Sequence, residues 1–223
     1  MCYSPEADLV AGLVVGAAGI DALRHVDDRR DLALAAVPLV LAAHQLIEAV
    51  GWWGLQDRVP EMAGTLAIGA YLIIAMGVVP ALVPYAVMRT ERDPTRRRMM
   101  VPLVVLGAVV SVVLLFALAT GPYGANIGGR YIAYETTLQW SGAIAISYVV
   151  AVCAPLLLST HRRLVLFGVI NIPIVVGLAT LLSAGFISLW CVWAAVSSIV
   201  ITRHIREQSA KTYGERTAAT ADG

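Results

Sequence analysis

The sequence predicts an all-α, multi-pass membrane protein with seven transmembrane helices in one bundle. Of its 223 residues, 59% are hydrophobic and only 14% are charged, and the mean hydropathy is +0.77. A typical soluble domain carries about 25% charged residues. Long apolar runs recur along the chain, and the basic residues gather in alternate connections between these runs. Composition and charge pattern therefore indicate the lipid bilayer as the main partner of this chain.

Seven apolar runs are long enough to cross about 30 Å of hydrocarbon, which takes about 20 helical residues. We place them at residues 7–23, 32–55, 62–88, 101–120, 138–159, 164–182 and 184–202. A tight turn at residues 183–185 separates the last two, because a single helix there would exceed any bilayer. Residues 1–206 thus form one transmembrane domain, and the polar segment 207–223 is expected to be a disordered cytoplasmic tail.

The basic residues predict the orientation. They follow the first, third, fifth and seventh runs, as Arg24, Arg29, Arg30, Arg89, Arg92, Arg96, Arg97, Arg98, Arg162, Arg163, Arg203, Arg206, Lys211 and Arg216. The opposite connections hold only Arg58 and Arg130. The positive-inside rule then places the N-terminus outside and the C-terminus in the cytoplasm. We interpret the arginine-rich segment 89–98 as a topology determinant beside lipid headgroups, and we expect no nucleic-acid partner.

Arginine is far more frequent than lysine, and alanine, valine and glycine are abundant. This bias is typical of a GC-rich bacterial genome, so the expected location is the cell inner membrane.

The segment LAAHQLIEAVGWW, residues 41–53, carries the main candidate site. His44 and Glu48 are four residues apart and share one helix face, and Gln45 and Trp52 flank that face. A charge at this depth costs at least about 2.5–3.5 kcal/mol, so these side chains are expected in the bundle interior. Glu48 is then either neutral or paired with His44.

Depth along the predicted helices indicates further members of this site. Tyr71, Ser188 and Cys191 fall at about the level of Glu48, and Tyr148 falls near the midplane. The predicted ligand-binding set is His44, Gln45, Glu48, Trp52, Tyr71, Ser188 and Cys191. Ionisable groups inside a membrane typically bind or move a small ligand, a proton or an ion. Alternatively, the polar pair only holds helices together, in a structural accessory subunit of a membrane complex.

Enzymatic alternatives are less well supported by the residues. The single lysine, Lys211, lies in the tail, so the last helix has no lysine for a retinal Schiff base. The other three histidines, His25, His161 and His204, fall at cytoplasmic helix ends, away from His44. A thiol or metal redox site stays open, with Cys2, His44, Glu48 and Cys191 as ligands, since both cysteines fall on the outer side. The sequence leaves the enzyme class, the metal ion and the oligomeric state open.

Three other features carry expectations. Gly12 and Gly16 form a small-xxx-small pair, which we expect to pack helices within the chain. Trp52, Trp53 and Tyr123 are expected in the outer aromatic belt. The connection at residues 121–139, with Arg130 and Glu135 as its charged groups, is interpreted as a flexible connection, although it is long enough to cover a pocket.

Several motifs resemble those of an uncharacterised family of bacterial polytopic membrane proteins, a domain of unknown function. They are MCYS at the start, HQLIEAVGW, VVPALVPYAVMRTERDPTRRR, APLLLSTHR and SLWCVWAAVSS. Members of that family begin Met-Cys-aromatic-Ser, carry a Gln-Gln-x-x-Glu-Gly-x-x-Trp-like segment, and end with a Ser-x-Trp-Cys-like helix. In this chain His44 replaces the first glutamine and Ala49 replaces the glycine. The resemblance implies a multi-helix bundle, gives more weight to Glu48, Cys2 and Cys191 than to His44, and supplies no activity.

Overall fold

The computed structural model describes residues 4–128, 131–136, 142–181, 197–207 and 209, with the backbone alone for residues 136 and 175–181. The helices are α1 (Pro5–Arg24), α2 (Leu32–Leu55), α3 (Glu61–Ile73), η1 (Ile74–Val78), α4 (Val79–Thr90), α5 (Pro94–Thr120), α6 (Gly142–Leu158) and α7 (Arg162–Leu181). Residues 197–207 form a further helical stretch. The bounds of α2 are those predicted. α5 begins at Pro94, seven residues before its predicted start, so Arg96, Arg97 and Arg98 lie in its first turns and not in the preceding connection.

α1 and α2 form an antiparallel pair through small residues. Gly12 and Gly19 leave no room for a side chain, because an added Cβ would lie 2.7 Å from Leu46 and from Leu39, respectively. Gly12, Gly16 and Gly19 are spaced by four and three residues and so share one face of α1. Small residues on such a face permit the backbones of two helices to approach closely. Gly12 and Gly16 therefore pack two helices of the same chain, which confirms the expectation from the sequence.

The third predicted span is one continuous run from Glu61 to Thr90, but it contains a π-helical segment, η1. The N–H of Val79 bonds the carbonyl of Ile74, five residues earlier. The next carbonyl, that of Ala75, would take its bond from residue 80 in the same register, but Pro80 has no N–H. The hydroxyl of Tyr148 in α6 donates to this carbonyl at 2.9 Å instead. The predicted span at residues 62–88 therefore contains a π-helical segment, and a neighbouring helix supplies the missing donor.

α5 lies close to the proline-rich part of α4. Pro84 has no N–H to donate to the carbonyl of Pro80 four residues earlier, so that carbonyl has no partner within its own helix. Gly107 of α5 lies directly against this carbonyl, and a Cβ at position 107 would collide with it. The proline spacing in α4 and the glycine in α5 are therefore complementary.

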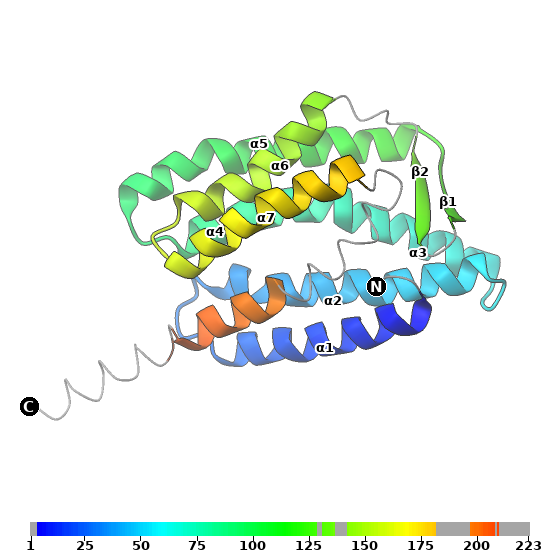
Figure 1. The fold of residues 1–223 in the computed structure, drawn as a ribbon, viewed down its shortest axis with the longest axis horizontal. Helices are drawn as coiled ribbons and strands as arrows, with labels where there is room; N and C mark the ends of the chain where they lie inside the picture. The colour runs from blue at the N-terminus through cyan, green and yellow to red at the C-terminus, as the bar shows by residue number, and fades with distance from the viewer. Residues whose placement is uncertain (1–3, 129–130, 137–141, 182–196, 208, 210–223) are drawn as a thin grey trace, which may run out of the picture.

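A β-hairpin follows α5, so the all-α prediction is wrong in this detail. Strands β1 (Tyr123–Ile127) and β2 (Ile132–Thr136) pair in antiparallel register, with Ala125 opposite Tyr134. The hairpin occupies part of the connection that was expected to be flexible. Figure 1 shows it at one end of the bundle, which we call the hairpin end.

The helices lie side by side along one axis (Figure 1), and α2 packs against α1, α3 and α4. The stretch 197–207 lies beside α1, because Thr202 donates to the carbonyl of Ala18 at 3.1 Å and Arg206 pairs with Asp21 at 2.6 and 2.7 Å. The first and last helical stretches of the described chain are thus neighbours. The predicted turn at residues 183–185 and most of the tail lie outside the described residues.

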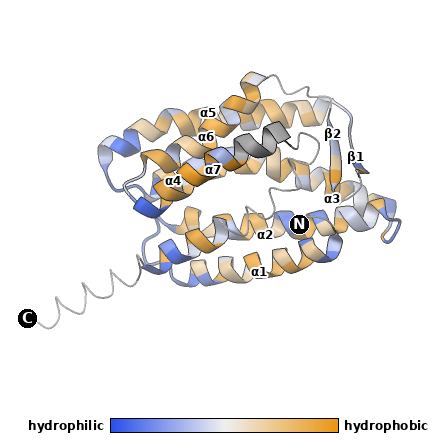
Figure 2. Ribbon diagram, viewed as in Figure 1, coloured by the Kyte–Doolittle hydropathy of each residue, from blue (hydrophilic) through white to orange (hydrophobic). Residues whose placement is uncertain are grey.

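The four basic connections gather at the end opposite the hairpin, which we call the basic end. Arg92 lies 4.0 Å from Asp28, Arg96 donates to the carbonyls of Leu158 and Ser159, and Arg163 pairs with Glu207. Figure 2 shows apolar residues along most of the helical ribbons and hydrophilic residues toward the two ends. Segments that the sequence assigns to one side of a membrane therefore do lie together.

Among the described residues, three helical runs are long and apolar enough to cross a membrane: Leu32–Leu55, Glu61–Thr90 and Pro94–Thr120. α6 is apolar but shorter. α1 carries Glu6, Asp8, Asp21 and Arg24, and it falls outside this group. Length and composition thus support three of the seven predicted spans.

Candidate functional site

Four side chains of α2 are buried near the hairpin end. His44 and Trp52 are each 3% exposed, and Gln45 and Glu48 are fully buried. Their spacing of three and four residues places them on the interior side of the helix. The structure therefore puts His44 and Glu48 where the sequence predicts them. Trp52, which was expected in an outer aromatic belt, is instead part of the interior.

Three rings from three elements stack beside Glu48. The ring of His44 in α2 lies 3.9 Å from that of Tyr71 in α3, with an interplanar angle of 20°. Tyr71 stacks in turn on Tyr134 of β2, at 4.5 Å and 7°. Tyr71 is 1% exposed, so the middle of the stack is closed to solvent. The predicted neighbourhood of His44 and Tyr71 is thus present as a ring contact.

The hairpin covers this end of the site. The hydroxyl of Tyr134 donates to Oε1 of Glu48 over 3.5 Å, a long hydrogen bond. The hydroxyl of Tyr123 lies over Gly69, where an added Cβ would be 3.0 Å from it. The connection therefore supplies Tyr134 to the site. The alternation of apolar and polar residues around this tyrosine in IAYET is typical of a β-strand and could have indicated the hairpin from the sequence.

Glycines let α2 and α3 meet closely enough for the rings to stack. Gly54 in the last turn of α2 and Gly64 in the first turn of α3 face each other, and a Cβ on either would collide with the backbone of the other. One turn deeper, Gly51 lies against Ile68. Since Tyr71 follows Ile68 by three residues, the same crossing brings its ring to His44.

Two buried polar atoms of the site have no hydrogen-bond partner in the part of the chain that the structure describes. They are Nε2 of His44 and Nε1 of Trp52. An unsatisfied buried donor costs about 1–3 kcal/mol, and such atoms are usually met by protein or by ordered water. Ordered water at each of these two atoms would remove its penalty.

Asp8 is a second buried carboxylate near this end, and the sequence analysis missed it. It is 1% exposed and belongs to the buried stripe of α1 that packs on α2, which is Pro5, Asp8, Gly12, Val15, Gly19 and Ala22. Because Gly12 lies opposite Leu46, the antiparallel register puts Asp8 about one turn nearer the hairpin end, level with about residue 50. Asp8 could have been predicted from the sequence, because Asp8, Val15 and Ala22 are seven residues apart and therefore lie on the same face of the helix.

The charge of the interior favours cations over anions. Asp8 and Glu48 are both buried, whereas no arginine or lysine of the described chain is. An anionic ligand beside Glu48 would meet its carboxyl group and, among the described residues, no compensating basic side chain apart from His44. The site is therefore suited to a proton, a small cation or a neutral hydrogen-bonding molecule.

Several predicted site residues are not brought into this cluster. Cys2, Ser188 and Cys191 lie outside the described residues, as does Arg130. Tyr148 donates to the carbonyl of Ala75 at 2.9 Å. Within the described ranges, no group of three or more histidine, cysteine, aspartate or glutamate side chains could hold a metal ion. His44 and Glu48 alone would supply two ligands, and a metal needs more.

A second polar cluster, at the basic end, is centred on Glu91, which is 1% exposed. Its carboxylate accepts bonds from the backbone and hydroxyl of Thr160 at 2.7 and 2.8 Å, from Asp93 N at 2.9 Å and from Ser159 Oγ at 3.3 Å. Burial raises the pKa of Glu91, but these donated hydrogen bonds and nearby His161 outweigh it, so the pKa lies below its ordinary value. Glu91 therefore clamps the turn after α4 to the turn after α6.

Asp31, His161 and His204 lie next to this clamp. Asp31 is 7% and His204 is 4% exposed, and the rings of His161 and His204 meet edge to face at 4.6 Å. Burial raises the pKa of Asp31, and Asp28 adds to this, while Thr90, Arg92 and His161 partly offset it. The sequence correctly separates His161 and His204 from His44, but it does not show that they meet.

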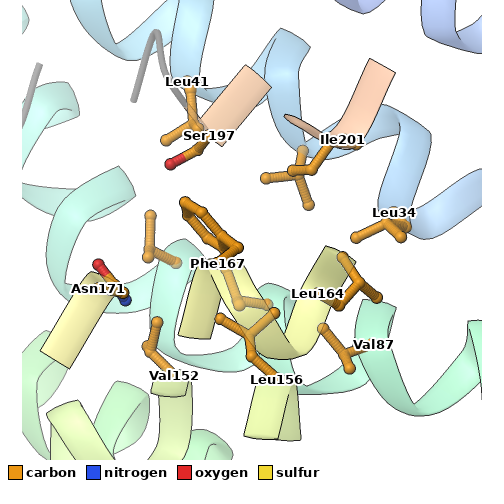
Figure 3. A pocket seen from close by; sticks show the side chains of 13 residues that line it. Leu34, Leu41, Val87, Val152, Leu156, Leu164, Phe167, Asn171, Ser197 and Ile201 are labelled. Atoms are coloured by element: carbon orange, nitrogen blue, oxygen red, sulfur yellow. The ribbon is translucent and has the colours of Figure 1, made fainter. Parts of the chain in front are cut away.

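A cavity of about 60 Å³ lies between the two polar clusters (Figure 3). Its walls come from α2, α4, α6, α7 and the stretch 197–207, and they are apolar except for Asn171 and Ser197. Asn171 is 2% exposed, its Nδ2 donates to Sγ of Cys153 at 3.1 Å, and its Oδ1 has no partner among the described residues. In Figure 3 the polar atoms of Asn171 and Ser197 lie on the side of Leu41, away from Leu34.

Comparison with known proteins gives a family but no activity. No curated protein matches this sequence, and no solved structure matches this fold. The resemblance to an uncharacterised family is confirmed: the model of a family of unknown function, DUF6629, matches residues 1–216, and the chain belongs to that family.

Proposed function

We propose that this chain is a seven-helix protein of the bacterial inner membrane, with a polar site in its interior that binds or moves a proton or small cation. The first support is the apolar surface. Large apolar side chains are exposed along α1, α5, α6 and α7, among them Val10, Val14, Val105, Val112, Phe116, Ile146, Leu166 and Val169. So wide an apolar surface is unfavourable in water and suits the hydrocarbon of a bilayer.

The proposed orientation has the hairpin end outside and the basic end in the cytoplasm. It rests on the arginines of four connections, which lie together at one end of the bundle. Positively charged connections are retained on the cytoplasmic side during insertion. In this orientation Glu48, His44 and the hairpin belong to the outer half of the membrane.

The single observation that carries the proposed activity is the complete burial of Glu48 beside the stacked rings of His44, Tyr71 and Tyr134. Holding a carboxyl group at membrane depth is costly, and such groups typically take part in binding or transfer. Two polar atoms that lack a partner among the described residues, on His44 and Trp52, lie on the same helix face.

Two alternatives are separated by experiment. If the chain is a structural accessory subunit, Glu48 keeps one state under all conditions. A thiol or metal enzyme would depend on Cys2 and Cys191, and substitution of either cysteine would abolish its activity without changing the behaviour of Glu48.

The test is infrared difference spectroscopy of the purified protein in lipid, recorded while the pH or the concentration of sodium or potassium is changed. We expect a carbonyl band of a protonated carboxyl group that responds to these changes and is absent in Glu48→Gln. Glu61→Gln is the matched control, because Glu61 is an exposed carboxylate at the start of α3. If Glu48→Gln and the wild type give identical difference spectra, Glu48 exchanges neither proton nor cation and the proposal is wrong.

A further inference from the structure

The interior face of α2 links the two polar clusters through the cavity. From the basic end it carries Asp31, then the cavity residues Leu34, Val37 and Leu41, and then His44 and Glu48. Asp31 and Glu48 are separated by about 25 Å along the helix axis. Polar groups therefore stand at both ends of an apolar segment that is not completely filled.

Each helical element around the cavity has a polar residue at the basic end, just beyond the residue that lines the cavity. A polar residue lies three positions beyond a cavity residue next to α2, in α4, next to α6, next to α7 and in the stretch 197–207. These polar residues are Asp31, Thr90, Ser159, His161 and His204. Three residues correspond to about 4.5 Å of rise, so they form a polar ring directly below the cavity walls. Leu34 above Asp31 and Ile201 above His204 are two examples.

We propose that this column is a proton path, in which protons pass between the site at Glu48 and the polar ring at the basic end through a cavity that fills transiently with water. The proposal rests on the function proposed above and adds the transported species and the route.

The cavity size selects the proton. A single water needs about 10–15 Å³ of such volume, so about 60 Å³ holds a short chain of waters but not an ion with its hydration shell. The apolar walls leave the cavity dry for most of the time, and dewetting of this kind gates conduction. Asn171 Oδ1, which has no partner in the described chain, and the Ser197 hydroxyl give entering water its first polar contacts.

The polar ring has the chemistry of a proton acceptor on the cytoplasmic side. Asp31 is buried, and the groups that face it are Asp28 on its own side and Thr90, Arg92 and His161 from the neighbouring elements. His161 in turn contacts His204. Its raised pKa allows Asp31 to take up protons closer to neutral pH than an exposed aspartate does.

The experiment measures proton flux in vesicles of phosphatidylcholine and phosphatidylglycerol that contain the full chain and a trapped pH-sensitive dye. A potassium gradient with valinomycin supplies the driving potential. Val83→Phe fills the cavity from α4, and Val109→Phe makes the same change at an exposed position of α5. We expect Val83→Phe to reduce the flux to that of protein-free vesicles and Val109→Phe to leave it unchanged.

Two further variants keep the test decisive. Val83→Ser adds a hydroxyl to the wall and should increase the flux, even if the phenylalanine variant does not fold. Asp31→Asn should reduce it, whereas Asp27→Asn, at an exposed position, should not. Gel filtration and thermal melting verify that each variant is folded.

The outcomes separate this inference from the proposed function. If wild-type protein conducts no protons while the infrared response of Glu48 persists, the proton path is wrong and the binding site stands. Equal flux through folded Val83→Phe and wild type also overturns the path. If Glu48 shows no response at all, the proposed function itself fails.

Discussion

Substitution of Glu91 by glutamine should destabilise the protein more than any exposed carboxylate substitution. Glu91 accepts four hydrogen bonds, two at each carboxylate oxygen. Glutamine keeps one acceptor oxygen, and its amide nitrogen then faces two donors. One of these is a backbone N–H, of Asp93 or Thr160, and the other is a hydroxyl that can rotate away.

The expected loss follows from these contacts. A buried N–H left without an acceptor costs about 1–3 kcal/mol, and a lost hydrogen bond to a charged group costs a similar amount. Allowing for rotation of the hydroxyl, we expect a loss of about 2–3 kcal/mol in the free energy of unfolding. For a chain of this length, this corresponds to a decrease of about 4–12 °C in the melting temperature.

The effect should also depend on pH. The pKa of Glu91 in the folded protein lies below its ordinary value of 4.5, so the folded state favours the carboxylate. The stabilisation is complete above the ordinary value and is lost as the pH falls through the lower folded value. The difference in melting temperature between wild type and Glu91→Gln should therefore be largest near neutral pH and should shrink in acid.

Tryptophan fluorescence of the detergent-solubilised protein on heating measures both effects, with Glu61→Gln as the control. An unchanged melting temperature in Glu91→Gln would refute the clamp, since the four donors would then be satisfied without the carboxylate.

Three further predictions concern packing, the polar site and topology. Gly107→Ala should cost about 1–3 kcal/mol of stability in the same melting assay, because its Cβ would collide with the carbonyl of Pro80, whereas Gly124→Ala, which meets nothing within 4 Å, should be neutral. Glu48→Gln should purify as a folded protein by gel filtration and Glu48→Lys should not, because the lysine would place an unpaired positive charge in the buried interior. Equal yields of the two variants would contradict the burial of Glu48. In a chain without native cysteines, a cysteine at Gly124 should react with an impermeant thiol reagent in intact cells and one at Thr95 should not, and the reverse pattern would invert the orientation.

Much of the helical framework was predictable because it depends on local properties. The bounds of α2 follow from an apolar run between Asp31 and the polar segment after Leu55. That Gly12 and Gly16 pack helices within the chain follows from their small size, which is visible in the sequence. The interior position of Glu48 follows from the energy of a carboxyl group in hydrocarbon, whatever the neighbouring helices are.

The partners of Glu48 were harder to predict. Tyr71 was found only by its depth along the predicted third span, which is similar to the depth of Glu48 in the second. Tyr134 was missed because a segment rich in glycine and polar residues was interpreted as a flexible connection. Asp8 was missed because it lies in the first turn of a helix, where acidic residues are common for a different reason, the helix dipole.

The sequence by itself determined which segments are helical and apolar, where the basic connections fall and that Glu48 lies inside, because each depends on the chemistry of one segment and its solvent. Only the tertiary structure decided that the hairpin covers Glu48, that Glu91 joins two turns, that the last helical stretch lies beside α1, and that a cavity separates two polar clusters. These features depend on which helices are neighbours. In hydrocarbon, apolar helices pack with little preference for one apolar partner over another, so neighbours are chosen by close fits such as Gly54 on Gly64 and by a few polar contacts, which a single sequence does not pair.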